Sequence, residues 1–162
     1  MSDPGAGSGT IRGWIGVNDT VMGGRSTSRM IRTPAGNLVF EGTLSLEGGG
    51  GFASVRCTTH PHLAGYRALA IQVRGDGRSY EIRLRTTTDR DGIAYRVLFS
   101  TSPGEWRSLE IPFTLFEPVF RGRPVPEAGP LDPAAVVQIG FLLADRKPGP
   151  FHLEVNRLDP VP

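Results

Sequence analysis

Residues 69–85 read LAIQVRGDGRSYEIRLR and give the clearest structural signal in this chain. Apolar side chains occupy every second position of two runs: Leu69, Ile71 and Val73, then Tyr80, Ile82 and Leu84. An alternation of period two is typical of strands that bury one face. Between the runs, Gly75-Asp76-Gly77 favours a tight turn. We therefore predict two antiparallel strands joined by a hairpin.

The same pattern recurs along the rest of the chain. Further strands are predicted at residues 38–46, 52–57, 93–99, 106–113, 136–143 and 151–158. The 22 glycines and 14 prolines fall between these runs, as expected of turns. A single helical turn is predicted at Asp132–Ala135, with Asp132 as its N-cap. The pattern predicts an all-β fold, an antiparallel two-sheet sandwich or jelly roll with at most one or two short helical turns.

The register of the alternation also predicts which side chains are buried. The inward set is Leu38, Phe40, Leu69, Ile71, Ile82, Leu84, Tyr95, Val97, Ile139 and Phe141. A slip of one residue in any strand would expose this whole face. Trp106 is assigned to the core as well.

Composition limits the class of protein. The 162 residues suit one domain, and we assign residues 1–10 to a disordered lead-in and residues 11–162 to a single sandwich. No apolar run approaches the ~20 residues of a membrane-spanning helix. A net charge of +2 gives no sign of nucleic-acid binding. The N-terminus resembles neither a secretory signal nor a transit peptide, so the expected location is cytoplasmic.

A polar loop, Asn18-Asp19-Thr20-Val21-Met22-Gly23-Gly24-Arg25-Ser26, precedes the predicted strands. Its polar groups either tie the loop internally or contact a ligand or partner. The candidate binding residues here are Asn18, Asp19, Arg25 and Ser26. We expect the Asp19 carboxylate to pair with Arg25, Arg78 or Arg121, because the chain is rich in arginine.

Several arginines are predicted to share one sheet surface. If Ile82 and Leu84 point inward, Arg83 and Arg85 point outward. Hairpin pairing would bring Arg74 and Arg96 beside them and create an exposed arginine face, Arg74, Arg83, Arg85 and Arg96, suited to an acidic partner. Asp76, Arg78 and Arg121 in the adjoining loops complete the candidate set. A simple solvated sheet surface is the alternative.

The motif Trp14-x-x-Val17-Asn18-Asp19-Thr20-Val21-Met22-Gly23-Gly24-x-Ser26 resembles the complex I intermediate-associated protein 30 family. Similar blocks follow in order at residues 40–46, 51–56, 74–80, 105–113, 120–123 and 149–151, so the resemblance covers most of residues 12–158. It implies a galactose-binding-like β-sandwich and a role in assembling respiratory complex I, the NADH:ubiquinone oxidoreductase.

No catalytic pattern accompanies this resemblance. The sequence contains no Gly-x-Ser-x-Gly elbow and no histidine spacing typical of a metal site. We therefore expect a non-catalytic module without cofactor or metal, which holds a protein partner or an assembly intermediate. The alternative is a carbohydrate-binding module of the galactose-binding-like class. Such sites usually need an exposed aromatic platform, and most aromatic residues here fall on inward positions.

Overall fold

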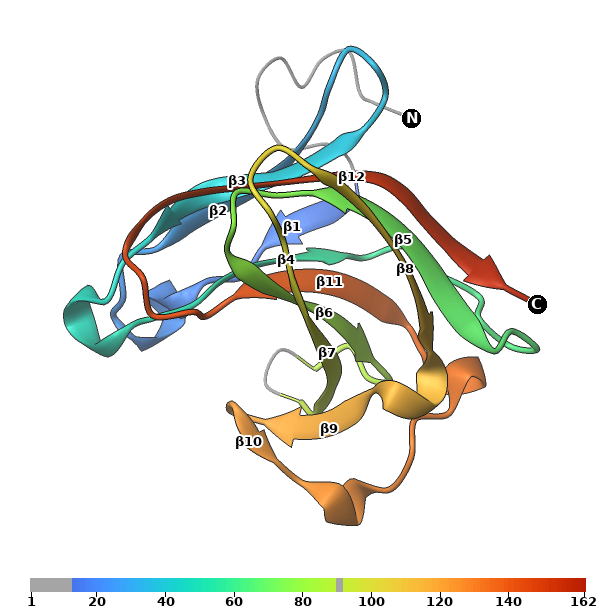
Figure 1. The fold of residues 1–162 in the computed structure, drawn as a ribbon. Helices are drawn as coiled ribbons and strands as arrows, with labels where there is room; N and C mark the ends of the chain where they lie inside the picture. The colour runs from blue at the N-terminus through green and yellow to red at the C-terminus, as the bar shows by residue number, and fades with distance from the viewer. Residues whose placement is uncertain (1–12, 90–91) are drawn as a thin grey trace.

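The chain forms two antiparallel β-sheets that pack face to face (Figure 1) in a computed structural model, which describes residues 13–89 and 92–162. The predicted lead-in, residues 1–10, lies outside the described residues. Helical structure in the described ranges is limited to short 3-10 turns. The predicted all-β sandwich is confirmed.

Each sheet combines strands from early and late parts of the chain. One sheet has seven strands in the order β1 (Trp14–Gly16), β4 (Ala53–Cys57), β11 (Gln138–Leu143), β6 (Ser79–Arg85), β7 (Ala94–Ser100), β9 (Glu117–Phe120) and β10 (Arg123–Pro124). The other has five, in the order β2 (Thr27–Arg32), β3 (Leu38–Leu44), β12 (Gly149–Val161), β5 (Ala68–Arg74) and β8 (Trp106–Pro112). All eight predicted strands occur, and β1, β2, β9 and β10 are additional.

Single helical turns connect several strands. Within the described ranges these are η2 (Asp19–Met22), η3 (Glu47–Gly49), η4 (Phe113–Leu115), η5 (Pro126–Ala128) and η6 (Pro133–Ala135). The last is the predicted turn, and the Asp132 side chain caps it by accepting a hydrogen bond from the Ala134 N–H at 3.0 Å. The sequence predicted at most one or two such turns, and the structure has more of them in the described ranges.

The predicted hairpin between β5 and β6 is wrong. Both edges of β5 are occupied, by β12 and β8, so β6 crosses to the other sheet and pairs with β11 and β7. Asp76 stabilises the crossing, because its carboxylate accepts hydrogen bonds from the Tyr80 hydroxyl at 3.0 Å and from the His152 N–H at 2.9 Å. Gly77 supplies the left-handed backbone, with a φ of 94°.

The core lies between the two sheets and follows the predicted register. Eight of the ten predicted residues are buried, and Leu38 and Val97 are partly buried against the same core. Trp14 stacks on Phe141 with ring centroids 6.3 Å apart. Trp106 is the exception among the predictions: it lies on the outer surface of β8, is 40% exposed, and has the Arg74 guanidinium 4.7 Å from its ring centroid.

Candidate functional site

The Asn18–Ser26 loop encloses a buried carboxylate. Asp19 is 0% exposed. Its Oδ1 accepts from the Ser26 N–H at 2.9 Å, and its Oδ2 accepts from the Ser26 hydroxyl at 2.7 Å and the Gly51 N–H at 2.8 Å. The predicted arginine partner is therefore wrong: backbone and hydroxyl donors satisfy this carboxylate, without the cost of burying a second charge.

The three arginines considered for Asp19 lie elsewhere. Arg25 is exposed and reaches Glu47, with Nε 3.5 Å from the carboxylate. Arg78 lies 3.6 Å from Asp145 and donates to the Lys147 carbonyl. The Arg121 guanidinium lies over the Phe120 ring, 5.2 Å from its centroid.

Asn18 links the same loop to two strands. Its side-chain oxygen accepts from the Ser28 hydroxyl of β2 at 2.6 Å and from the Ser54 N–H of β4 at 3.0 Å. Asn18, Asp19 and Ser26 thus hold the two sheets together at one end of the sandwich. These contacts favour a structural role for this part of the motif.

Two buried carboxylates have a lowered pKa. Burial raises the pKa of Asp19, but the hydrogen bonds from Ser26 and from the Gly51 N–H outweigh it, so the net pKa lies below 3.8. Burial likewise raises the pKa of Glu154, but the hydrogen bonds from Asn37 and Arg74 and the charge of Arg74 outweigh it, so the net pKa lies below 4.5. The Arg74 guanidinium donates to Glu154 at 2.7 Å, and Asn37 donates at 2.7 Å.

We expect acid to destabilise the fold through these two groups. A carboxyl whose pKa is depressed by folding contributes stability that is present above its unfolded-state pKa and is lost as the pH falls through the folded-state value. The loss should begin below pH 4.5 for Glu154 and below pH 3.8 for Asp19. Thermal unfolding followed from neutral pH to pH about 2.5 measures it. Glu154→Gln should flatten the upper part of this slope, and an unchanged slope in that variant would contradict the assignment.

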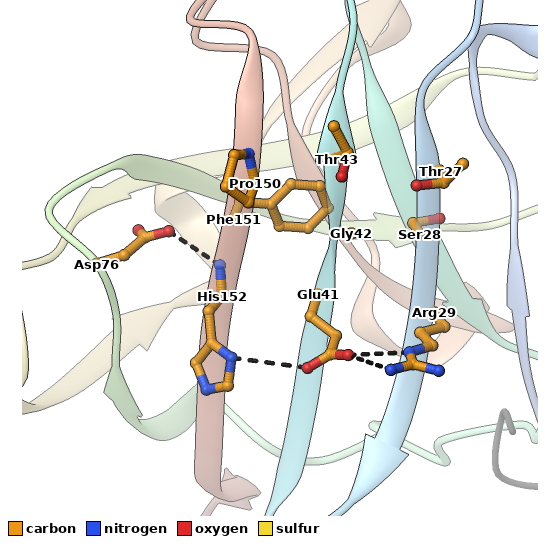
Figure 2. Close-up of a pocket in the computed structure, with 10 residues that line it drawn as sticks. All are labelled: Thr27, Ser28, Arg29, Glu41, Gly42, Thr43, Asp76, Pro150, Phe151 and His152. Carbon is orange, nitrogen blue, oxygen red and sulfur yellow. Dashed lines mark hydrogen bonds and ion pairs between the residues drawn. The ribbon is translucent and has the colours of Figure 1, made fainter. Parts of the chain in front are cut away.

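A shallow cleft of about 720 Å³ lies on the outer surface of β2, β3 and β12 (Figure 2). Its arginine is paired within the cleft: Arg29 donates to Glu41 at 2.9 and 2.6 Å, and His152 Nδ1 lies 3.7 Å from the same carboxylate. The one aromatic side chain among its described lining residues, Phe151, is 3% exposed. The cleft therefore lacks the aromatic platform expected of a sugar site.

The outer surface of the seven-stranded sheet carries a different pattern. Strand pairing aligns Arg56, Gly140, Arg83 and Arg96 across β4, β11, β6 and β7, and we call this set the arginine row. Ile15 and Glu117 extend it at its two ends. Arg74 is not part of it, because β5 belongs to the other sheet, where Arg74 pairs with Glu154.

The predicted exposed arginine face is wrong in its exposure as well as in its membership. The side chains of Arg83 and Arg96 are 14% and 18% exposed, and Arg85 is 7% exposed and donates to the Gly92 carbonyl at 3.1 Å. Glu81 holds two of them, at 2.8 Å from Arg83 and 3.7 Å from Arg96. Long arginine stems pack along a sheet and leave only part of each guanidinium in water.

Two members of the row were not predicted. Arg56 alternates with the buried Val55, so the strand period alone could have placed it outward. Gly140 has no such signal, because its importance comes from spacing between strands: a Cβ there would lie 2.5 Å from the Val55 carbonyl oxygen. Exposed apolar side chains adjoin the row at Leu98, 57% exposed, and Ile15, 48% exposed.

Solved structures confirm the sandwich. The chain resembles the family 11 carbohydrate-binding module of a cellulosomal cellulase from Clostridium thermocellum, with a TM-score of 0.69 and 14% identity over 93% of this chain and 88% of the module. A family 11 carbohydrate-binding module from Clostridium thermocellum in complex with a β-1,3-1,4-mixed-linked tetrasaccharide gives a TM-score of 0.68 at 14% identity, over 93% of this chain and 89% of the module. At this identity the likeness shows the fold alone.

The relatives found by sequence are complex I intermediate-associated proteins and not carbohydrate-binding modules. The mitochondrial complex I intermediate-associated protein 30 of Mus musculus is 30% identical, over 88% of this chain and 50% of the mouse protein. The protein of the same name from Neurospora crassa is 33% identical, over 86% and 57%. The chain thus spans about half the length of the curated relatives it matches. The expected cytoplasmic location is contradicted by these relatives, which are named as mitochondrial proteins.

A family model agrees with these relatives. It describes complex I intermediate-associated protein 30 and matches residues 6–155. The matched region includes the Asn18–Ser26 loop and every member of the arginine row. The chain belongs to the complex I intermediate-associated protein 30 family.

Proposed function

We propose that this chain is a binding module that holds a protein partner, a subunit or an intermediate of respiratory complex I, while that complex is assembled. The observation that carries the proposal is the family match over residues 6–155. The relatives are named for their association with complex I intermediates. Holding a partner in this way requires a binding surface and does not require a catalytic side chain.

The outer surface of the seven-stranded sheet is the best candidate for that contact. Its arginines and the exposed Leu98 and Ile15 give it the mixed character of a protein interface, where arginine and apolar side chains are enriched. The cleft in Figure 2 suits a partner less well, because the large apolar side chain among its described lining residues, Phe151, is buried. No helix in the described part of the chain is long and apolar enough to cross a bilayer.

Affinity capture from the source cell tests this proposal. The tagged chain should enrich subunits of the NADH:ubiquinone oxidoreductase over an untagged control, as quantified by mass spectrometry. Arg29→Gln changes the five-stranded sheet instead of the proposed contact surface, so this variant should capture the same subunits as wild type. Capture of polysaccharide-degrading enzymes or glycans in their place would support the carbohydrate-binding alternative and refute the assembly role.

A further inference from the structure

The five-stranded sheet ends at β8, a strand of seven residues with one free edge. β8 runs beside β5 (Figure 1), and the register between the two strands is continuous over the whole length of β8. The strand contains no lysine, and its proline is the last residue. Short length, bulges, lysines and central prolines are common devices that keep a sheet edge from pairing with another chain. β8 has none of these four devices.

The other sheet edges in the described part of the chain are less open. β1 and β10, at the two ends of the seven-stranded sheet, have only three and two residues. β2, at the far end of the five-stranded sheet, packs against β1, where a Cβ on Gly16 would lie 3.1 Å from the Ser28 carbonyl oxygen. Within the described ranges, β8 is therefore the long edge that can accept another strand.

The two charged side chains of β8 do not block its edge. Arg107 turns across the sandwich, where its Nη1 donates to the Ser100 carbonyl at 2.6 Å and to the Ser100 hydroxyl at 3.1 Å. Glu110 pairs with Arg67 of the same chain, at 3.0 Å. Both charges are thus held within the chain, and the groups that remain at the edge are those of the backbone.

Every second residue of β8 directs its backbone to the free edge. Just beyond the paired strands, the Phe113 N–H donates to the Arg67 carbonyl at 3.0 Å. In an antiparallel pair, residues hydrogen-bonded to the neighbour alternate with residues whose N–H and C=O groups point away from it. Counting back from Phe113, the odd-numbered residues of β8 face β5. The N–H and C=O groups of Trp106, Ser108 and Glu110 therefore face the edge.

This edge matches a second copy of itself. Antiparallel pairing of two β8 strands around Leu109 overlaps the whole strand and places each edge-facing residue opposite another. Leu109 then faces its own copy, which is an apolar pair. Trp106 faces Pro112 of the second copy, which is another. Ser108 faces Glu110, so that a hydroxyl meets a carboxylate. Pro112, which has no N–H, falls at the last pair of the ladder, where its missing donor matters least.

Other registers match less well. Moving the centre of the pairing to Ser108 places Trp106 opposite the Glu110 carboxylate. Moving it to Glu110 places two carboxylates directly opposite each other, which is destabilising. Both changes also shorten the overlap between the strands. The side chains of β8 therefore favour the register centred on Leu109.

We propose that two copies of this chain associate edge to edge through β8, with Leu109 on the two-fold axis, and so join their five-stranded sheets into one continuous sheet. A two-fold contact uses the same surface on both copies, so one pairing satisfies both edges and leaves none for a third copy. This association goes beyond the proposed function, because it requires no subunit of complex I.

A charge at position 108 tests the pairing by analytical ultracentrifugation of the full chain over a dilution series. Ser108 is exposed and faces Glu110 of the second copy twice in each dimer. Ser108→Lys should lower the dimer dissociation constant about tenfold and Ser108→Glu should raise it about tenfold, the sum of two cross-strand charge pairs. Non-specific repulsion has the opposite sign, because lysine adds to a net charge of +2. A damaged fold would weaken the dimer in both variants.

Cysteine substitutions test the register. Ser108→Cys/Glu110→Cys places thiols on residues that oppose each other between copies, with Cα atoms about 5.5 Å apart, a separation that a disulfide spans. Under mild oxidation the double variant should give a covalent dimer on a non-reducing gel. Each single variant should give none, because its cysteine then faces a serine or a glutamate. Wild type, whose one cysteine is Cys57, sets the baseline.

Three results overturn the inference. The first is a chain that stays monomeric throughout the dilution series, and the second is a dimer on which Ser108→Lys and Ser108→Glu act alike. The third is a covalent dimer from Ser108→Cys alone, which would put a different residue on the axis. If wild type is monomeric and Ser108→Glu loses the complex I subunits that wild type captures from cells, the edge takes a strand of that partner in place of a second copy.

Discussion

Replacing Asp19 with asparagine is expected to lower the free energy of unfolding by about 3–5 kcal/mol, a sum over the hydrogen bonds that the carboxylate makes. Both oxygens of Asp19 face a backbone N–H, Oδ1 that of Ser26 and Oδ2 that of Gly51. Whichever way the asparagine amide is turned, its NH₂ group therefore meets a backbone N–H that has lost its acceptor. Because Asp19 is 0% exposed, water does not replace the missing bond.

Urea unfolding of Asp19→Asn against wild type measures this loss. Asp132→Asn is the matched control, because Asp132 caps an exposed turn and asparagine is an equally good N-cap. The control should change stability by less than about 0.5 kcal/mol. If the two substitutions have equal effects, the buried carboxylate does not stabilise the fold as its contacts indicate.

Replacing Gly50 with alanine should lower the free energy of unfolding nearly as much, by about 3 kcal/mol, which is the upper end of the usual cost of overpacking. The backbone of Gly50 is ordinary, with a φ of −73°, so alanine meets no conformational barrier there. The cost is steric: the new Cβ would lie 2.3 Å from Asp19 Oδ2 and 3.0 Å from the Gly24 Cα. Relief of that contact requires Asp19 to give up its hydrogen bonds.

The neighbouring Gly49→Ala separates steric from backbone effects. Gly49 has a φ of 77° and nothing within 4 Å of an added Cβ, so alanine there costs only the left-handed conformation, about 1 kcal/mol. Thermal and urea unfolding of the pair should place Gly50→Ala clearly below Gly49→Ala in stability. The reverse order would show that the loop moves away from Asp19 freely.

Local alternation was enough to predict the strands but not their partners. A strand that buries one face must repeat every second residue, so residues 69–74 and 79–85 are visible in the sequence. The glycines at 75 and 77 suit a hairpin and a crossing between sheets equally well. What decides between them is the pairing of β5 with β12, which joins Arg74 to Glu154, 80 residues further along the chain. No local pattern reports such a pair.

The same limit applies to the candidate site. The Asn18–Ser26 loop was recognised as unusual, but the contacts of Asp19 and Asn18 depend on Gly51 and Ser54, which reach them from another part of the chain. The outward direction of Arg83 and Arg85 followed from the alternation, whereas their low exposure depends on Glu81 and on how arginine stems pack. Trp106 was misassigned because an aromatic residue at a strand end is compatible with either face.

The position of β12 has a consequence for synthesis of the protein. This strand comes last in the order of the described strands, yet it lies at the centre of the five-stranded sheet, between β3 and β5. A ribosome delivers the chain from its N-terminus, so β3 and β5 emerge long before the strand that joins them. Until then their backbone donors and acceptors face solvent at unpaired edges, which are prone to join other chains. A nascent chain therefore completes this sheet only after nearly all of the domain has left the exit tunnel.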